Sequence, residues 1–120
     1  TPLDYREAAE LAGDDSQFFD LNYCFSDTDQ PLRDMAVLTG SSGVKMTMAS
    51  TAPGLQAYDA GTMKDQDHPS HIGRPYKPYA GFALEAQRWP GALAHSHFPS
   101  FEYGPEHPFE QTTQWRFEVT

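Results

Sequence analysis

Cysteine is almost absent from this sequence, since Cys24 is the only one among 120 residues. A disulfide within the chain is therefore excluded. Scarce cysteine is typical of a reducing compartment, and no signal peptide is recognisable, so we expect a cytoplasmic protein. Basic residues are also few: 8 Lys and Arg stand against 17 Asp and Glu, for a net charge of -9. Such a surface repels phosphate-rich partners, and we expect neither nucleic acid nor an anionic membrane among them.

Long apolar runs are missing as well. No stretch approaches the roughly 18 residues of a membrane span. Hydrophobic residues make up 38% of the chain, against about 45–50% in an average domain when glycine is counted too. This low content suggests that part of the apolar surface is completed by other polypeptide. Because the chain starts at Thr1 without an initiator Met, we expect a fragment or a processed product.

Several catalytic signatures are absent too. Neither a G-x-S-x-G nucleophile motif nor a glycine-rich phosphate loop before a helix occurs. Histidines do form H-x-x-H (His68, His71) and H-x-H (His95, His97) pairs, with His107 further on. These lie among Pro and Ser, and no third ligand follows at a spacing typical of zinc sites. We therefore expect no metal site.

Helical periodicity is weak, whereas alternation with a period of two is frequent. The best helix candidate is 5–13, which ends in a glycine. Strands are predicted at 18–25, 32–39, 43–50, 54–58, 82–89 and 113–119. Segment 32–50 is typical of a hairpin, and 61–81 and 90–112 are long loops of the kind that often carry function. The sequence thus predicts an all-β fold in which Trp115, Phe117 and Val119 are buried and Cys24 is a packed thiol.

Three polar side chains interrupt otherwise apolar strands, namely Asp20, Gln56 and Glu85. A carboxylate in such a place is costly unless it is paired or faces water or a cleft. Asp20 and Glu85 therefore either face solvent on the outside of a sheet or line a surface that binds a polyol. Two carboxylates also suit a glycosidase, and the spacing alone does not choose. Nearby aromatic side chains that could stack on a sugar are Tyr58, Trp89 and Trp115.

Five segments, in order, resemble the C-terminal third of the aldose 1-epimerase family. They are TPLDYR (1–6), FFDLNYCF (18–25), LTGSSGVKMTMASTAPGLQAYDAG (38–61), YAGFALEAQRWPGA (79–92), and FPS with GPEHPFEQTTQWRFEV (98–100 and 104–119). They are similar to the family's T-P-x-D-F-R, G-x-D-H-N-F, P-G-x-Q-x-Y, L-E-x-Q and closing F-P…F-x-v segments. Departures are Leu21 for the usual His, Tyr23 for Phe, Gly91 for Asp, and the His107–Pro108 pair.

This resemblance implies a fold and a set of roles. The fold is a large antiparallel β-sandwich of the supersandwich type, of which residues 1–120 form the C-terminal portion, with the N-terminal portion absent. Glu85 falls on the family's catalytic base, while Asp20 and Gln56 fall on residues that hold sugar hydroxyls. The family's acid histidine lies in the absent portion, so we expect this chain alone to be inactive.

The implied reaction interconverts the α and β anomers of a free aldohexose, such as galactose or glucose, without a cofactor. One alternative is a relative that acts on a hexose 6-phosphate, for which Arg74, Lys77 and Arg88 are the available cations. Another is a non-catalytic carbohydrate-binding β-domain, which would keep the aromatic residues and have no need of Glu85. The expected partners are a monosaccharide and the remaining part of the fold.

Overall fold

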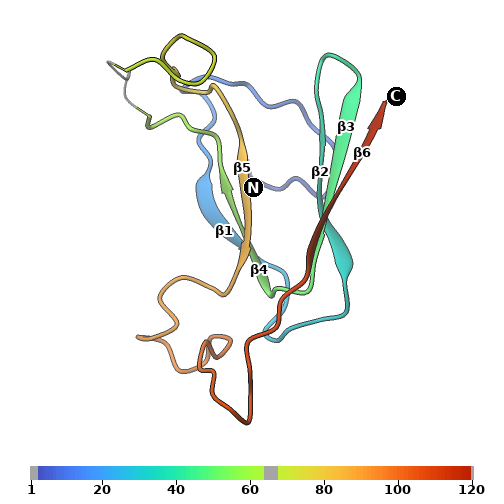
Figure 1. Ribbon diagram of the computed structural model, residues 1–120, viewed down its shortest axis with the longest axis vertical. Helices are drawn as coiled ribbons and strands as arrows, with labels where there is room; N and C mark the ends of the chain where they lie inside the picture. The colour runs from blue at the N-terminus through green and yellow to red at the C-terminus, as the bar shows by residue number, and fades with distance from the viewer. Residues whose placement is uncertain (1–2, 64–67, 120) are drawn as a thin grey trace. The chain divides into compact units, whose positions relative to one another are not determined.

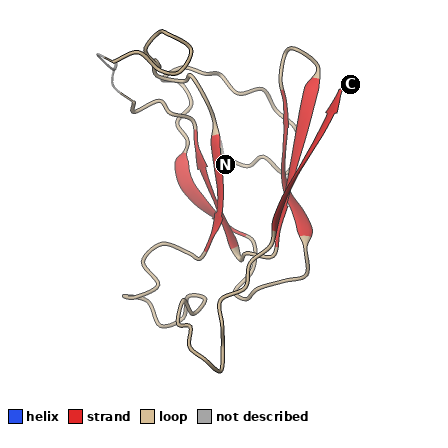
Figure 2. Cartoon of the chain, viewed as in Figure 1, coloured by secondary structure: helices blue, strands red, loops and turns tan. Residues whose placement is uncertain are grey.

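The protein is described by a computed structural model that covers residues 3–63 and 68–119. Thr1 and Pro2 of the TPLDYR segment, and residues 64–67 of the predicted 61–81 loop, lie outside the described residues. Every regular element in the described chain is a strand (Figure 2), which confirms the all-β prediction. The helix predicted at 5–13 is wrong, because this segment forms an irregular, mostly exposed chain. Its short apolar pattern finds no face to pack on, and tertiary packing rather than propensity stabilises most helices.

Six strands form two three-stranded sheets. The strands are β1 (Asp20–Cys24), β2 (Arg33–Thr39), β3 (Val44–Ser50), β4 (Gly54–Tyr58), β5 (Ala83–Gln87) and β6 (Thr113–Val119). One sheet has the order β1-β4-β5 and the other β2-β3-β6 (Figure 1). The predicted hairpin is confirmed, since β2 pairs antiparallel with β3. No described helix is long and apolar enough to cross a membrane.

The chain divides into two compact units, the first made of Thr1–Asp20 and Tyr58–Ala83. Phe19 is its buried centre, with ring contacts to Tyr5 at 5.0 Å and to Phe82 at 5.4 Å between centroids. The buried Asp59 carboxylate accepts hydrogen bonds from the backbone N–H groups of Phe19 (3.0 Å) and Gly61 (2.8 Å). These two donors compensate for removing the charge from water.

The second unit, Leu21–Ala57 with Leu84–Thr120, contains most of both sheets. Its core joins Met35 of β2, Met48 of β3 and Leu55 of β4, with Leu84 and Ala86 of β5 packed against them. Core side chains therefore come from both sheets. Met35 sits at a shift of register between β2 and β3, and such a bulge turns an extra residue inward.

The chain passes from one sheet to the other through a buried corner between β3 and β4. Ser50, Ala52 and Pro53 are all fully or almost fully buried. The Arg33 guanidinium donates to the carbonyl of Ser50 (3.3 Å) and of Ala52 (3.0 Å). Buried carbonyls need such partners. Arg33 therefore supplies hydrogen-bond donors to the carbonyl groups of the corner that places β4 against the core.

Strand β6 corrects the prediction that its apolar side chains are buried. Cross-strand pairing sets Trp115 opposite Met48, Phe117 opposite Met46 and Val119 opposite Val44. Paired residues point to the same face, so these side chains share the core face of β3. Yet Trp115 is 50% exposed, Phe117 67% and Val119 87%. The predicted alternation is right, but the core covers this face only near Met48.

Candidate functional site

Strand β4 has one apolar and one polar face. Leu55 and Ala57 are buried, and Leu55 is part of the core. Successive side chains of a strand point to opposite faces. Gln56 and Tyr58 therefore lie on the face turned away from the core, where both are half-buried. Tyr58 is already engaged there, since its hydroxyl lies 3.0 Å from the Thr62 hydroxyl.

Strand β5 repeats this pattern beside β4. Leu84 and Ala86 pack against the core, and Glu85, between them, is exposed. Because β4 and β5 are neighbours and both turn their apolar residues to the core, Glu85 and Gln56 share the opposite face. Glu85 thereby avoids the cost of a buried charge. The structure thus brings two of the three predicted site residues to one face of one sheet.

Asp20 is the first residue of β1 and is exposed. Strand β1 is the other neighbour of β4. Asp20 belongs to the first compact unit, however, whereas Gln56 and Glu85 belong to the second. The structure therefore supports the strand and the exposure expected for Asp20, and its grouping with the other two residues stays a prediction.

Two further polar residues lie on this sheet, and the sequence analysis did not single them out. The Gln87 Nε2 group donates a hydrogen bond to Asn22 Oδ1 at 3.3 Å. Gln87 follows Glu85 by two residues, so the two share a face of β5. The signal that could have found this pair was present, since Asn22 and Gln87 belong to the same two motif segments as Asp20 and Glu85.

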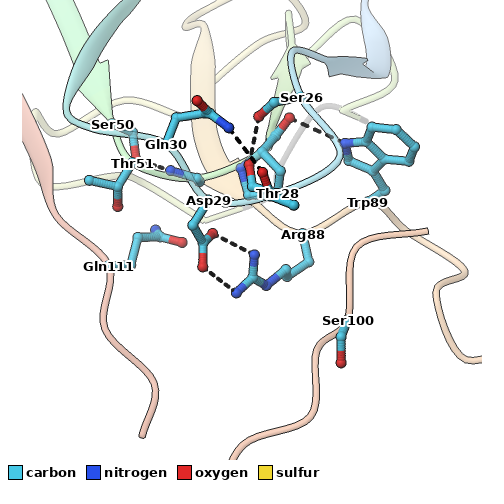
Figure 3. Close-up of polar contacts among 12 residues, drawn as sticks. Ser26, Thr28, Asp29, Gln30, Ser50, Thr51, Arg88, Trp89, Ser100 and Gln111 are labelled. Atoms are coloured by element: carbon cyan, nitrogen blue, oxygen red, sulfur yellow. Dashed lines mark hydrogen bonds and ion pairs between the residues drawn. The ribbon is translucent and has the colours of Figure 1, made fainter. Parts of the chain in front are cut away.

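Arg88, just beyond β5, is committed to an ion pair. Its guanidinium binds the Asp29 carboxylate with two contacts, 2.5 Å and 2.7 Å (Figure 3). The hydrogen bond to Asp29 raises the pKa of Arg88 above its ordinary value. Such a bidentate pair fixes geometry more firmly than a single contact. Arg88 therefore ties the segment before β2 to the end of β5.

Trp89 packs as part of the scaffold rather than as an open sugar platform. Its Nε1 group donates to the Pro53 carbonyl at 3.2 Å (Figure 3). Its ring meets Phe98 edge-on, at 5.2 Å between centroids. Cys24, predicted to be packed, is instead exposed at the end of β1. That correction follows from its place on the polar face of β1, two residues after Asn22.

The histidines make aromatic and polar contacts. The rings of His95 and His97 meet edge-on at 5.8 Å between centroids, and both rings contact Phe98. The hydroxyl of Tyr76 lies 2.8 Å from His71 Nδ1. Within residues 3–63 and 68–119, no group of three or more His, Cys, Asp or Glu side chains is arranged to hold a metal ion.

Comparison with known proteins identifies the family of this chain. The sequence model of one family, described as aldose 1-epimerase, matches residues 1–116. The chain belongs to the aldose 1-epimerase family. Galactose mutarotases from Bos taurus and Sus scrofa are each 31% identical over 123 residues, and that of Homo sapiens is 30% identical over 127. Each comparison covers 99% of this chain and 36% of the relative, so the chain spans about a third of their length.

The observed all-β architecture is consistent with membership of this family. The antiparallel sheets agree with the β-sandwich expected for an aldose 1-epimerase. Leu21, which stands where the family pattern has His, is half-buried on β1. By alternation it points opposite to Asp20 and Asn22. The substitution therefore changes the packed face of β1 and leaves the polar residues of that strand in place.

Proposed function

We propose that this chain contributes the catalytic base and part of the sugar-binding face of an aldose 1-epimerase. The reaction interconverts the α and β anomers of a free aldohexose of the galactose or glucose type. The observation that carries the proposal is Glu85, exposed at the centre of β5 and on the same face as Gln56. It stands in a chain whose family match spans residues 1–116.

The chemistry of mutarotation suits these side chains. A base removes the proton of the anomeric hydroxyl, the bond between the anomeric carbon and the ring oxygen breaks, and an acid protonates that oxygen. The resulting aldehyde then closes on its other face. No electrons are gained or lost, so the reaction itself calls for no redox cofactor. An exposed carboxylate such as Glu85 can accept the first proton, while Gln56 and Asp20 bind hydroxyls and hold the ring.

The proton donor in this proposal lies outside residues 1–120. We assign no acid role to His71, His95 or His97, whose rings engage Tyr76, Phe98 and one another. The partner that supplies the donor is the remaining part of the fold. The relatives are about three times as long as the stretch they share with this chain, which leaves room for that part.

The uncovered apolar face of the β2-β3-β6 sheet is where we place this partner. Trp115, Phe117 and Val119 are exposed on the core face. The opposite face instead carries ion pairs, Lys45–Glu118 at 3.2 Å and Arg116–Asp34 at 2.7 Å. Ion pairs are stable in contact with water, whereas a contiguous exposed apolar surface is typical of a docking surface.

The hexose 6-phosphate alternative receives less support from the charges. A phosphate site needs an uncommitted guanidinium or ammonium group. Arg88, the candidate nearest to Glu85 in sequence, is already paired with Asp29. The second alternative to the epimerase is a β-domain that binds a sugar without catalysis.

One experiment separates catalysis from binding alone. Anomer exchange of galactose is followed by polarimetry, and galactose binding by ligand-observed NMR, on the same preparation of the complete fold. Exchange and binding together support the epimerase. Binding without exchange would favour the non-catalytic domain, and exchange only with galactose 6-phosphate would favour the phosphate-dependent relative.

A further inference from the structure

Two amide side chains meet across the middle strand of the β1-β4-β5 sheet. Asn22 extends from β1 and Gln87 from β5, and β4 runs between these strands. Neighbouring strands are about 4.8 Å apart, so side chains from the outer two must span roughly twice that distance. The hydrogen bond of 3.3 Å from Gln87 Nε2 to Asn22 Oδ1 closes this span. Both side chains are half-buried.

The hydrogen bond between Asn22 and Gln87 forms a bridge across β4, and this bridge passes over a glycine, Gly54. A Cβ atom added at Gly54 on β4 would lie 2.9 Å from Asn22 Oδ1 and 2.9 Å from Trp89 Cδ1. Contacts that short essentially never occur for a real Cβ, so any side chain at this position would displace the amide or the indole. The Trp89 ring is in turn held by its hydrogen bond to the Pro53 carbonyl. The absence of a side chain at Gly54 therefore leaves room for the Asn22 amide, which accepts the hydrogen bond from Gln87, and for the Trp89 ring.

The remaining polar group of Asn22 is also engaged. Its Nδ2 lies 3.5 Å from Cys24 Sγ on the same strand. Asn22 thus offers its oxygen to Gln87 and its nitrogen to Cys24, which fixes the orientation of the amide plane. A side chain held at both ends is less free to rotate, and it can define the distance between two strands.

Each part of the bridge is two residues from a predicted site residue on the same strand. Gln87 follows Glu85, Gly54 precedes Gln56, and Asn22 follows Asp20. Residues two apart on a strand share a face and lie roughly 6.6 Å from each other. The bridge therefore forms the next row of side chains beside Gln56 and Glu85.

We infer that Asn22 and Gln87, meeting over Gly54, are positioning residues for the sugar site. They tie β1 to β5 across β4, and so hold the strand that carries Glu85 in place beside the strand that carries Gln56. This role rests on the proposed function. Reactive groups displaced by about 1 Å can lose a factor of 10² in rate, so a strand spacing fixed by side chains matters for a site built across strands.

A purely structural tie would make the same hydrogen bond, so the test needs a readout of the sugar. The variants, all made in the protein with the complete fold, are Asn22→Ala, Gln87→Leu and the double variant. Gln114→Leu is the matched control, because it makes the same exchange at an exposed position on β6. Galactose affinity is measured for each by ligand-observed NMR. Circular dichroism and urea unfolding measure the stability of each variant in parallel.

We expect the effects of the two substitutions on galactose affinity to be coupled. Each single variant should weaken galactose binding about 5-fold, the value of one ordinary hydrogen bond. The double variant should bind no more weakly than either single one, because the bridge is lost only once. The Gln114→Leu control should bind as the unchanged chain does. The Gln87 side-chain amide resonance in Asn22→Ala should also move from its position in the unchanged protein.

The outcomes are distinguishable. A Gln87 amide resonance that stays in place in Asn22→Ala would show that the two side chains do not meet. Unaltered galactose affinity in variants of reduced stability would reduce the bridge to a structural tie, and additive losses near 25-fold would mean that the two amides act separately. Each of these three results overturns the inference and leaves the proposed function standing. Failure of the complete fold with the unchanged sequence to bind galactose would instead contradict the proposed function, and the positioning role with it.

Discussion

Glu85 illustrates how a single charged residue can be tolerated in the middle of a strand. Its neighbours Leu84 and Ala86 pack on the core, and the alternation of the strand turns the carboxylate outward. An ordinary surface carboxylate can be replaced with a change in stability of under about 0.5 kcal/mol and no other effect. A catalytic base cannot, and the difference is measurable.

Glu85→Gln in the protein with the complete fold should lower kcat by about 10²–10⁴-fold, the usual contribution of general acid–base catalysis. The amide keeps its hydrogen bonds and cannot accept the proton, so sugar should still bind. Initial rates of anomer exchange under saturating sugar give kcat directly. Glu118→Gln, which changes an exposed carboxylate on β6, is the control. A near-normal kcat for Glu85→Gln would eliminate it as the base.

Asp20→Asn should act on affinity rather than on turnover. A charge-assisted hydrogen bond to a sugar hydroxyl is worth about 1.5–3 kcal/mol, so KM should rise roughly 10- to 100-fold. The kinetics are measured over a range of sugar concentrations that reaches saturation. Leu21→Ala, one residue on and facing the other side of β1, should reduce stability and leave KM unchanged. An unchanged KM in Asp20→Asn would contradict the substrate-binding role.

Tyr79 gives a pH-dependent prediction at the residue scale. Its hydroxyl donates to the Asp15 carboxylate at 2.6 Å, and this hydrogen bond, ahead of desolvation and the nearby negative charges, raises its pKa to about 12 from 10.0. The protonated phenol is the form that the fold stabilises. The contribution is therefore complete below pH 10 and is lost as pH rises from 10 towards 12. Ultraviolet titration of Tyr79→Phe should lack the last phenol to ionise, and an unchanged titration end would contradict the assignment.

At the scale of the element, the strands were predictable because their cause is local. Alternation along one strand predicts its two faces without any knowledge of the neighbour. The bounds of β4 and β6 agree with 54–58 and 113–119, and the other four strands lie within the predicted ranges. Polar exceptions such as Glu85 were visible for the same reason, since each breaks an apolar run.

What the sequence could not predict depends on contacts between elements. Segment 5–13 has a helix-like pattern but takes an irregular course, because a short helix needs a packing face. The Asn22–Gln87 hydrogen bond joins residues far apart in sequence through an opening at Gly54. Alternation showed that Trp115 shares a face with its neighbours on β6, but not that the face is uncovered.

The stability of both sheets should depend on the core around Met48, because its side chains come from both of them. Met48 is fully buried and belongs to a cluster that also contains Leu55 of β4. Met48→Ala should lower the free energy of unfolding by about 2–5 kcal/mol, through lost burial and the cavity that remains. Val37→Ala on neighbouring β2, where the side chain is 55% exposed, should cost far less. Urea unfolding followed by circular dichroism compares the two, and equal losses would contradict the described core.

At the scale of the whole molecule, the uncovered apolar face of β6 and the proton donor that the proposed mechanism places outside the chain both call for further polypeptide. In the β2-β3-β6 sheet, the core face carries the exposed side chains of Trp115, Phe117 and Val119, while charged side chains on the opposite face form ion pairs. A sheet with one solvated face and one apolar face normally buries the latter against another layer. The proposed mechanism independently needs a proton donor from outside the chain. One additional body of polypeptide would meet both needs.

Residues 1–120 alone should therefore fail to accelerate mutarotation. A base without its acid loses the part of catalysis that a positioned proton donor supplies, typically a factor of 10²–10⁴. The measurement is polarimetry of freshly dissolved α-galactose with and without the purified chain, with the Bos taurus galactose mutarotase as the positive control. A rate that rises in proportion to the concentration of the chain, and that Glu85→Gln abolishes, would show that the 120 residues hold both the acid and the base, and that the proposed division of the site is wrong.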